Sequence, residues 1–166
     1  MEKFNVGIIG YSWVATAHIA AINASESAQV TALVSSRKHD DRVLSNRYGT
    51  NITSYTDLNQ MLADKSIDVV SVCSYNYQHK EQVIAAAKAG KHIILEKPMA
   101  LSWEDCKEIE AAVTQAGVGF CMCFECRWSN QFLSTKEIVD KGLIGELHYA
   151  EVDYLHGLGP WYKQFE

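Results

Sequence analysis

Short apolar runs of strand length alternate with helical patterns as far as residue 124, and this alternation constrains the fold more than any other feature. The runs are almost continuously apolar, which is typical of strands buried on both faces of a parallel sheet. Helical segments between consecutive strands supply the crossovers that such a sheet needs. The sequence therefore predicts an α/β fold with a doubly wound parallel sheet. The predicted strands cover residues 5–10, 28–36, 51–54, 67–74, 92–96 and 117–124.

The segments between these strands have the period of amphipathic helices. In the first helix we expect one shared apolar face, formed by Val14, Ala17, His18, Ala21 and Ile22. A later helix ends at Gly90, a usual residue after a helix, and another begins at Ser102, where Asp105 completes a capping-box pattern. The predicted helices cover 13–25, a polar stretch to about residue 48, 55–64, 78–89 and 102 to about 115.

The pattern changes after residue 124, so we expect one domain over 1–124 and the start of a second, incomplete α/β domain over 125–166. The second segment begins with a predicted helix over 130–141, and alternating residues then predict a strand around 146–155. Because this strand would lack a partner in so short a segment, we expect it to pair with another chain or to be poorly ordered.

Composition narrows the possible partners and location. The chain has 166 residues and a net charge of −5 without a basic cluster, which argues against nucleic acid and anionic membranes as partners. No apolar run reaches the roughly 20 residues that span a bilayer. The N-terminus lacks a signal-peptide pattern, and five cysteines are then expected to be reduced thiols. A cytoplasmic location fits best.

The first strand, turn and helix read "GIIGYSWVATAH". Gly10 allows a tight turn, the small Ser12 lets a pyrophosphate approach the backbone, and Ala15 lets helix and strand pack closely. Only one of the usual three glycines is present, so the pattern alone is a weak signal that simple close packing would also explain. Its place directly after the first strand favours a dinucleotide-binding turn.

The end of the second strand indicates which dinucleotide would bind. An acidic residue there would hold the ribose 2′-OH of NAD, but the sequence has Ser35, Ser36, Arg37 and Lys38. Hydroxyls and a guanidinium suit a 2′-phosphate, which favours NADP over NAD as the cofactor. The alternative is an arginine that is simply solvated in a loop.

The fifth strand runs into Glu96, Lys97 and Pro98. Lys97 follows a strand near the point where the strand order reverses, which is the usual ligand site of such sheets. An ammonium group partly removed from water can exchange a proton with a substrate hydroxyl. Glu96 could orient Lys97 or contact the ribose, and Pro98 would fix the local backbone. The alternative is an exposed lysine at a strand end.

Two further groups of residues are candidates. Asn76 and His79 follow the fourth strand, where a loop would face the cofactor, and we expect His79 to have a contact or structural role. Cys121, Cys123 and Cys126 could hold a metal with a nearby histidine. Their spacing is poor for zinc and cysteine in a strand behaves as a small hydrophobe, so no metal site is predicted.

The stretches "GIIGYSWVATAH", "YNYQH", "AGKHIILEKPMALS" and "RWSNQFLSTKEIVDKGLIGEL" together resemble the glucose–fructose oxidoreductase and inositol dehydrogenase family (Gfo/Idh/MocA). The resemblance implies an NAD(P)-binding Rossmann domain, followed by an α/β domain that completes the substrate site and commonly mediates oligomerisation. It also implies an oxidoreductase of sugars, polyols or related alcohols and carbonyls, so a small-molecule substrate and a homo-oligomer are expected.

The resemblance also implies roles for individual residues. Lys97 would be the catalytic lysine, and it would also contact the cofactor. The pyrophosphate turn would comprise Gly10, Tyr11, Ser12, Trp13 and Val14. The 2′-phosphate contacts would be Ser36 and Arg37, and further cofactor contacts would come from Asn76, His79 and Glu96.

The chain departs from the family in three ways. Ser12 replaces the middle glycine, and Tyr75 stands where a proline is common before Asn76. Family members are roughly twice as long, and their aspartate and histidine partners lie beyond the end of this chain. Trp161 and Tyr162 could approach the nicotinamide in a complete enzyme. The alternative hypothesis is therefore a dinucleotide-binding fragment without activity of its own.

Overall fold

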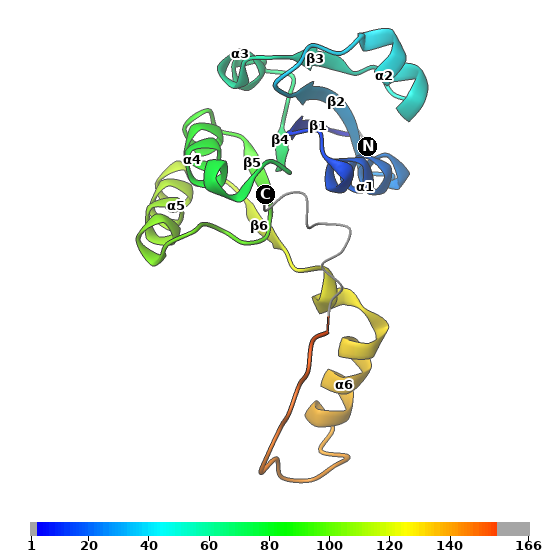
Figure 1. Ribbon diagram of the computed structural model, residues 1–166, viewed down its shortest axis with the longest axis vertical. Helices are drawn as coiled ribbons and strands as arrows, with labels where there is room; N and C mark the ends of the chain where they lie inside the picture. Colours follow the sequence, from blue (N-terminus) through cyan, green and yellow to red (C-terminus); the bar gives the residue numbers. More distant parts are fainter. Residues whose placement is uncertain (1–2, 156–166) are drawn as a thin grey trace. The chain divides into compact units, whose positions relative to one another are not determined.

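The computed structural model describes residues 3–155, which separate into two units. The first unit ends at Phe124 and the second begins at Glu125. The first unit contains a six-stranded sheet with the order β3-β2-β1-β4-β5-β6, in which every neighbouring pair is parallel (Figure 1). The strands are β1 (Phe4–Ile9), β2 (Ala28–Val34), β3 (Thr53–Tyr55), β4 (Val69–Val72), β5 (His92–Glu96) and β6 (Phe120–Cys123).

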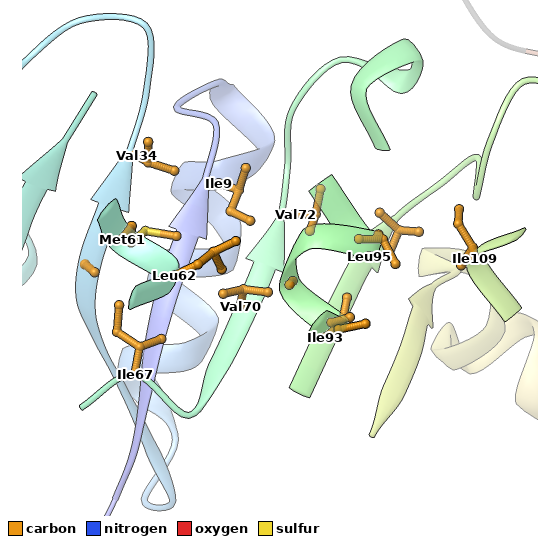
Figure 2. Close-up of a cluster of buried hydrophobic side chains, with 14 residues drawn as sticks. Ile9, Val34, Met61, Leu62, Ile67, Val70, Val72, Ile93, Leu95 and Ile109 are labelled. Carbon is orange, nitrogen blue, oxygen red and sulfur yellow. The ribbon is translucent and has the colours of Figure 1, made fainter. Parts of the chain in front are cut away.

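Helices cover both faces of this sheet. Ala15 and Ile19 of α1 pack with Leu44 of α2 in one buried cluster, so these two helices share a face. A second cluster contains buried residues of α3, α4 and α5 on the opposite face (Figure 2). The helices are α1 (Trp13–Ala24), α2 (Asp41–Tyr48), α3 (Leu58–Ala63), α4 (His79–Lys88) and α5 (Trp103–Ala116), with a 3₁₀ turn η1 (Asn76–Gln78) before α4. The predicted doubly wound α/β fold is confirmed.

The side-chain alternation of the strands divides their residues between the two clusters. Val70 and Val72 of β4 belong to the cluster under α3, α4 and α5, as do Ile93 and Leu95 of β5 (Figure 2). The residues between them point to the other face, where α1 lies. The side chains on that face include Ser71 in β4 and Cys73 directly after it. They also include Glu96 at the end of β5, and Cys121 and Cys123 in β6.

The helix boundaries differ from the sequence prediction by a few residues, because caps decide where each helix begins. Asp40 and Asp57 accept hydrogen bonds from first-turn N–H groups of α2 and α3, and Ser102 does the same for α5. The predicted apolar face of α1 is wrong in part. Ala17 and Ala21 are exposed, and Ala15 and Ile19 are buried in their place.

The second unit contains a 3₁₀ turn η2 (Glu125–Trp128) and α6 (Asn130–Asp140), which begins at the N-cap Ser129. The strand predicted around 146–155 is wrong: these residues are exposed and belong to no strand. An alternating sequence forms a strand only when a neighbouring strand accepts its hydrogen bonds, and the described part of the chain offers none there.

None of the helices within residues 3–155 is both long enough and apolar enough to cross a membrane.

The backbones that follow β1 and β4 approach each other closely at the point where the strand order reverses. Gly10 has a φ of 91°, and a Cβ added there would lie 2.9 Å from the Cys73 carbonyl oxygen and from two backbone atoms of Ser74. The Gly10 N–H also donates to the carbonyl of Val34. Gly10 is therefore required twice, by its backbone conformation and by the space available.

We expect Gly10→Ala to lower the free energy of unfolding by about 2–5 kcal/mol, because a left-handed conformation and a backbone clash act together. Gly49→Ala is the matched control, since Gly49 has a φ of 72° but nothing within 4 Å of an added Cβ. Gly49→Ala should lower the free energy of unfolding by only about 1–2 kcal/mol. Urea denaturation of both variants measures the difference, and equal losses would contradict the role assigned to close packing at Gly10.

Candidate functional site

The candidate site lies outside the carboxyl ends of β1 and β4, which is where ligands bind in sheets of this topology. β2 and β3 lie on one side of β1, and β5 and β6 lie on the other side of β4. The loops after β1, β2, β4 and β5 therefore open at the same edge of the sheet. These loops, together with the ends of the strands and helices that flank them, contain the residues that the sequence predicted for cofactor binding.

The turn after β1 presents the N-terminus of α1 at this edge. Ser12 is the N-cap residue, but its side chain accepts no bond from the helix; its hydroxyl donates instead to the Cys73 carbonyl at 3.3 Å. The first turn of α1 contains no acidic residue. A helix N-terminus of this kind attracts anions, since its N–H groups and dipole both favour negative charge. Trp13 is 60% exposed beside it, and Val14 packs against the core under α1.

Tyr11 connects this turn to α2. Its hydroxyl lies 2.7 Å from the Tyr48 hydroxyl, and its ring meets the His39 ring edge-on at 4.9 Å between centroids. Arg47 donates to the Tyr11 hydroxyl at 3.4 Å. Burial, together with the bond to Tyr11, raises the pKa of Tyr48 to about 12, so the Tyr48 hydroxyl stays protonated at neutral pH. The Tyr11 side chain therefore has a structural role, in which it connects the turn to Tyr48 and His39.

The loop after β2 contains one uncommitted cation. Ser35 holds the loop, since its hydroxyl donates to the Arg37 carbonyl at 2.8 Å. Lys38 is engaged by the Ser54 carbonyl and by Asp41. Ser36 and Arg37 are exposed, and within residues 3–155 the Arg37 guanidinium makes no hydrogen bond or ion pair. Arg37 is therefore available to an anionic ligand, and no other group would have to release it.

The loop after β4 contains an exposed aromatic pair. Tyr75 and Tyr77 stack with 5.9 Å between ring centroids and an interplanar angle of 9°, and each is 67% exposed. Asn76, the predicted cofactor contact, lies between them and is exposed at the start of η1. The tyrosine that replaces the more common proline is thus accommodated by stacking.

His79 lies inside the fold, which favours the structural role over a cofactor contact. Its side chain is fully buried, and its Nδ1 donates to the Pro98 carbonyl at 2.8 Å. Its Nε2 faces the Ser74 carbonyl at 3.3 Å. His79 therefore ties the loop after β4 to the segment after β5, which is the structural role that the sequence left open.

Lys97 directly follows β5 and is exposed, and its peptide bond to Pro98 is cis. Within the described residues its ammonium group has no hydrogen bond or ion pair. The sequence analysis expected this ammonium group to be partly removed from water, but Lys97 is exposed in the described part of the chain. One oxygen of Glu96, Oε2, accepts the Lys97 backbone N–H at 3.1 Å. Glu96 orients the backbone of Lys97, as the sequence analysis allowed.

The second oxygen of Glu96 belongs to a buried polar network that the sequence did not reveal. His18 of α1 lies with Nε2 3.0 Å from Glu96 Oε1 and with Nδ1 2.8 Å from the Ser71 hydroxyl. The side chains of His18 and Glu96 are 14% and 15% exposed, and Ser71 is fully buried. The sequence placed His18 on an apolar helix face. A polar residue at a core-facing position of α1 was the available signal, but its partners lie 53 and 78 residues further along the chain.

The cysteines of the β6 region differ in burial. Cys121 and Cys126 are exposed, and Cys123, two residues after Cys121, is half-buried beside Glu96. Burial, reinforced by the Glu96 carboxylate, raises the pKa of the Cys123 thiol to about 11. All five cysteines are free thiols. Trp161 and Tyr162, which the sequence suggested near the nicotinamide, lie outside the described residues.

Residues 4–124 match a family described as an oxidoreductase family with an NAD-binding Rossmann fold (GFO_IDH_MocA). The chain belongs to the Gfo/Idh/MocA oxidoreductase family. It is 31% identical over 147 residues to myo-inositol 2-dehydrogenase of Thermotoga maritima, a match that covers 89% of this chain and 44% of that protein.

The name of a second relative specifies NADP(+). The chain is 25% identical to the scyllo-inositol 2-dehydrogenase (NADP(+)) IolW of Bacillus subtilis, over 93% of this chain and 42% of that protein. Among solved structures, scyllo-inositol dehydrogenase of Lactobacillus casei with bound NAD(H) and scyllo-inositol aligns with a TM-score of 0.79 and 25% identity. The alignment covers 87% of this chain and 43% of that structure. The chain thus spans less than half the length of these relatives.

A double-mutant cycle tests the His18–Glu96 contact. We expect His18→Ala and Glu96→Ala each to lower the free energy of unfolding by about 1–3 kcal/mol, since each leaves a part-buried polar partner unsatisfied. The pair should show a coupling energy of about 1–2 kcal/mol in urea denaturation. His18→Ala combined with Asp57→Ala, which removes a helix cap on the other face, should be additive within about 0.5 kcal/mol. Additivity in the first cycle would contradict a direct interaction.

Proposed function

We propose that this chain is the dinucleotide-binding part of an NAD(P)-dependent oxidoreductase that transfers a hydride to or from a sugar, polyol or related alcohol or carbonyl. The observation that carries the proposal is the convergence of three features at one sheet edge: the α1 N-terminus after Gly10, the uncommitted Arg37, and the exposed Lys97. Membership of a family with an NAD-binding Rossmann fold supports the same reading.

In this proposal the turn from Gly10 to Val14 receives the pyrophosphate. Gly10 keeps Cβ atoms out of the narrow space beside β4, and the Ser12 hydroxyl donates to the Cys73 carbonyl instead of capping α1. The first-turn N–H groups of α1 then donate to phosphate oxygens. Asn76, in the loop after β4, is proposed to contact the same cofactor from the other side of the switch point.

NADP is the proposed cofactor, with NAD as the alternative. One relative is named for NADP(+) and another was solved with NAD(H), so the choice between the two cofactors is argued from the residues of this chain. Arg37 and the exposed Ser36 can donate to a 2′-phosphate, whereas no carboxylate stands at the end of β2 to bind the free ribose hydroxyl.

Lys97 is the proposed proton-handling residue. Bound nicotinamide would supply the hydride chemistry. The Lys97 ammonium would polarise the substrate oxygen and donate a proton to it as the carbon is reduced, and the neutral Lys97 amine would take the hydroxyl proton when the carbon is oxidised. Glu96 would hold the backbone of Lys97 through Oε2, and His18 would hold Glu96 through Oε1. The substrate class is taken from the relatives, which are named as inositol dehydrogenases.

The alternative is a dinucleotide-binding module without activity of its own. It is favoured by the extent of the chain, which spans less than half of its relatives. We propose that residues 125–166 begin a substrate and oligomerisation domain, of which the described part is α6 and the exposed residues after it.

Cofactor choice can be measured directly on the chain. NADPH should bind more tightly than NADH in a titration of intrinsic fluorescence, because the 2′-phosphate gains a charge-assisted contact with Arg37. Arg37→Ala should weaken NADPH binding by roughly 10- to 100-fold and leave NADH almost unchanged. Arg42→Ala, an exposed arginine of α2, is the matched control and should alter neither. Equal affinity of the unaltered chain for both dinucleotides would remove the 2′-phosphate argument.

Turnover separates the enzyme from the binding module. The chain is mixed with NADPH or NADP and a panel of sugars and polyols, and absorbance of the reduced nicotinamide is followed. If a substrate reacts, Lys97→Ala should lower kcat by roughly 10²- to 10⁴-fold with cofactor affinity retained. Full activity of Lys97→Ala would refute its catalytic role. Cofactor binding without turnover of any panel member would favour the module.

A homo-oligomer and a cytoplasmic location complete the proposal. Leu143, Leu147, Val152 and Leu155 of the second unit are each more than half exposed, which favours burial against another chain. Five free thiols suit a reducing compartment. Light scattering after size exclusion should give a mass of at least two chains, and Leu147→Asp with Val152→Asp should shift it to one. A monomeric unaltered chain at micromolar concentration would contradict self-association.

A further inference from the structure

Three side chains with different metal-binding atoms meet on the α1 face of the sheet. His18, Glu96 and Cys123 can each offer one ligand atom such that all three atoms lie within 4.8 Å of one another. All three side chains are partly buried, so this is not a chance group of exposed acids. They come from α1, β5 and β6, which belong to the same structural unit.

The sheet register explains why these residues meet. Glu96 and Cys123 are paired in register between the neighbouring parallel strands β5 and β6, so their side chains project side by side from the same face. His18 lies in the middle of α1, which covers this face. The expectation of no metal site rested on the spacing of three cysteines, and only one of those cysteines takes part here.

Two of the three ligands, His18 and Glu96, are also held by a second partner, as ligands of metal sites usually are. The Ser71 hydroxyl lies 2.8 Å from His18 Nδ1, which leaves Nε2 directed at the shared space. Glu96 uses Oε2 for the Lys97 N–H and directs Oε1 at the same space. A proton shared between Nε2 and Oε1, 3.0 Å apart, satisfies both atoms when no cation is present. A purely structural His–Glu pair is therefore the competing explanation.

We propose that His18 Nε2, a Glu96 carboxylate oxygen and Cys123 Sγ form a binding site for a borderline divalent cation of the Zn²⁺ class. Imidazole, carboxylate and thiolate are all zinc ligands, whereas a thiolate disfavours Mg²⁺ and Ca²⁺. In a tetrahedral zinc site the ligand atoms lie roughly 3.3–3.6 Å apart, so small side-chain rotations suffice to close this group around an ion. The fourth position stays open to water or another ligand, and binding releases the thiol proton to solvent.

Cobalt and zinc titrations of the reduced, chelator-treated chain test the site without any dinucleotide, so the outcome is independent of the proposed oxidoreductase function. Co²⁺ should bind with one equivalent per chain and give a thiolate-to-cobalt charge-transfer band, which Zn²⁺ then abolishes by displacement. Cys123→Ser should remove the band. His18→Gln should keep a weakened band and lower Zn²⁺ affinity, measured by chelator competition, by at least about 10- to 100-fold.

Cys121→Ser is the matched control, because Cys121 lies two residues away in the same strand and is exposed. It should leave the band and the Zn²⁺ affinity unchanged, as should Cys126→Ser. Ser71→Ala should weaken Zn²⁺ binding by about 10-fold, since it frees the orientation of the His18 ring. A band that survives in Cys123→Ser, a band lost in Cys121→Ser, or no band in the unaltered chain would each overturn the proposal.

A labelling experiment on the unaltered chain covers the case in which Cys123→Ser fails to fold. Iodoacetamide labelling with peptide mapping should show that Zn²⁺ protects Cys123 and leaves the labelling of Cys121 and Cys126 unchanged. Equal labelling of Cys123 with and without Zn²⁺ would refute the site, because a bound thiolate is shielded from alkylation.

Discussion

The narrow space between β1 and β4 is the constraint on which the candidate site depends. At this point the strand order reverses, and Gly10 brings its backbone against Cys73 and Ser74 with no room for a Cβ. The positive φ of Gly10 turns the chain directly into α1, so the helix begins at the sheet edge with its N-terminus open. A bulkier residue would move the start of α1 away from that edge, and the anion-binding geometry would be lost with it.

α1 links the two ends of the candidate site. Its first turn lies at the proposed pyrophosphate position, and His18, further along the same helix, bonds to Glu96 at the end of β5. Glu96 in turn holds the N–H of Lys97. His79 adds a second connection, from the loop after β4 to Pro98. Backbone and buried side chains, rather than contacts of the Lys97 ammonium itself, therefore fix where Lys97 is presented.

Local sequence patterns predicted most of the elements but not all of their boundaries or contacts. Most strands of the first unit were predictable because they are apolar and lie next to a helical period, and Ser102 caps α5 as its pattern indicated. The alternating pattern around 146–155 predicted a strand that does not form, because strand formation depends on a neighbouring strand and not on the alternating pattern alone. His79 resembled a loop residue near the cofactor, yet burial against two carbonyls gives it a structural role.

The sequence by itself determined the doubly wound sheet, the glycine turn before α1, the basic residue after β2 and the lysine after β5, because each depends on a local pattern or on its place beside a strand. Only the tertiary structure decided that His18, Ser71, Glu96 and Cys123 share one face. Those residues are widely separated in the chain, and they meet because the parallel register of β4, β5 and β6 aligns them under α1. Strand pairing is a long-range property, and no local stretch of sequence records it.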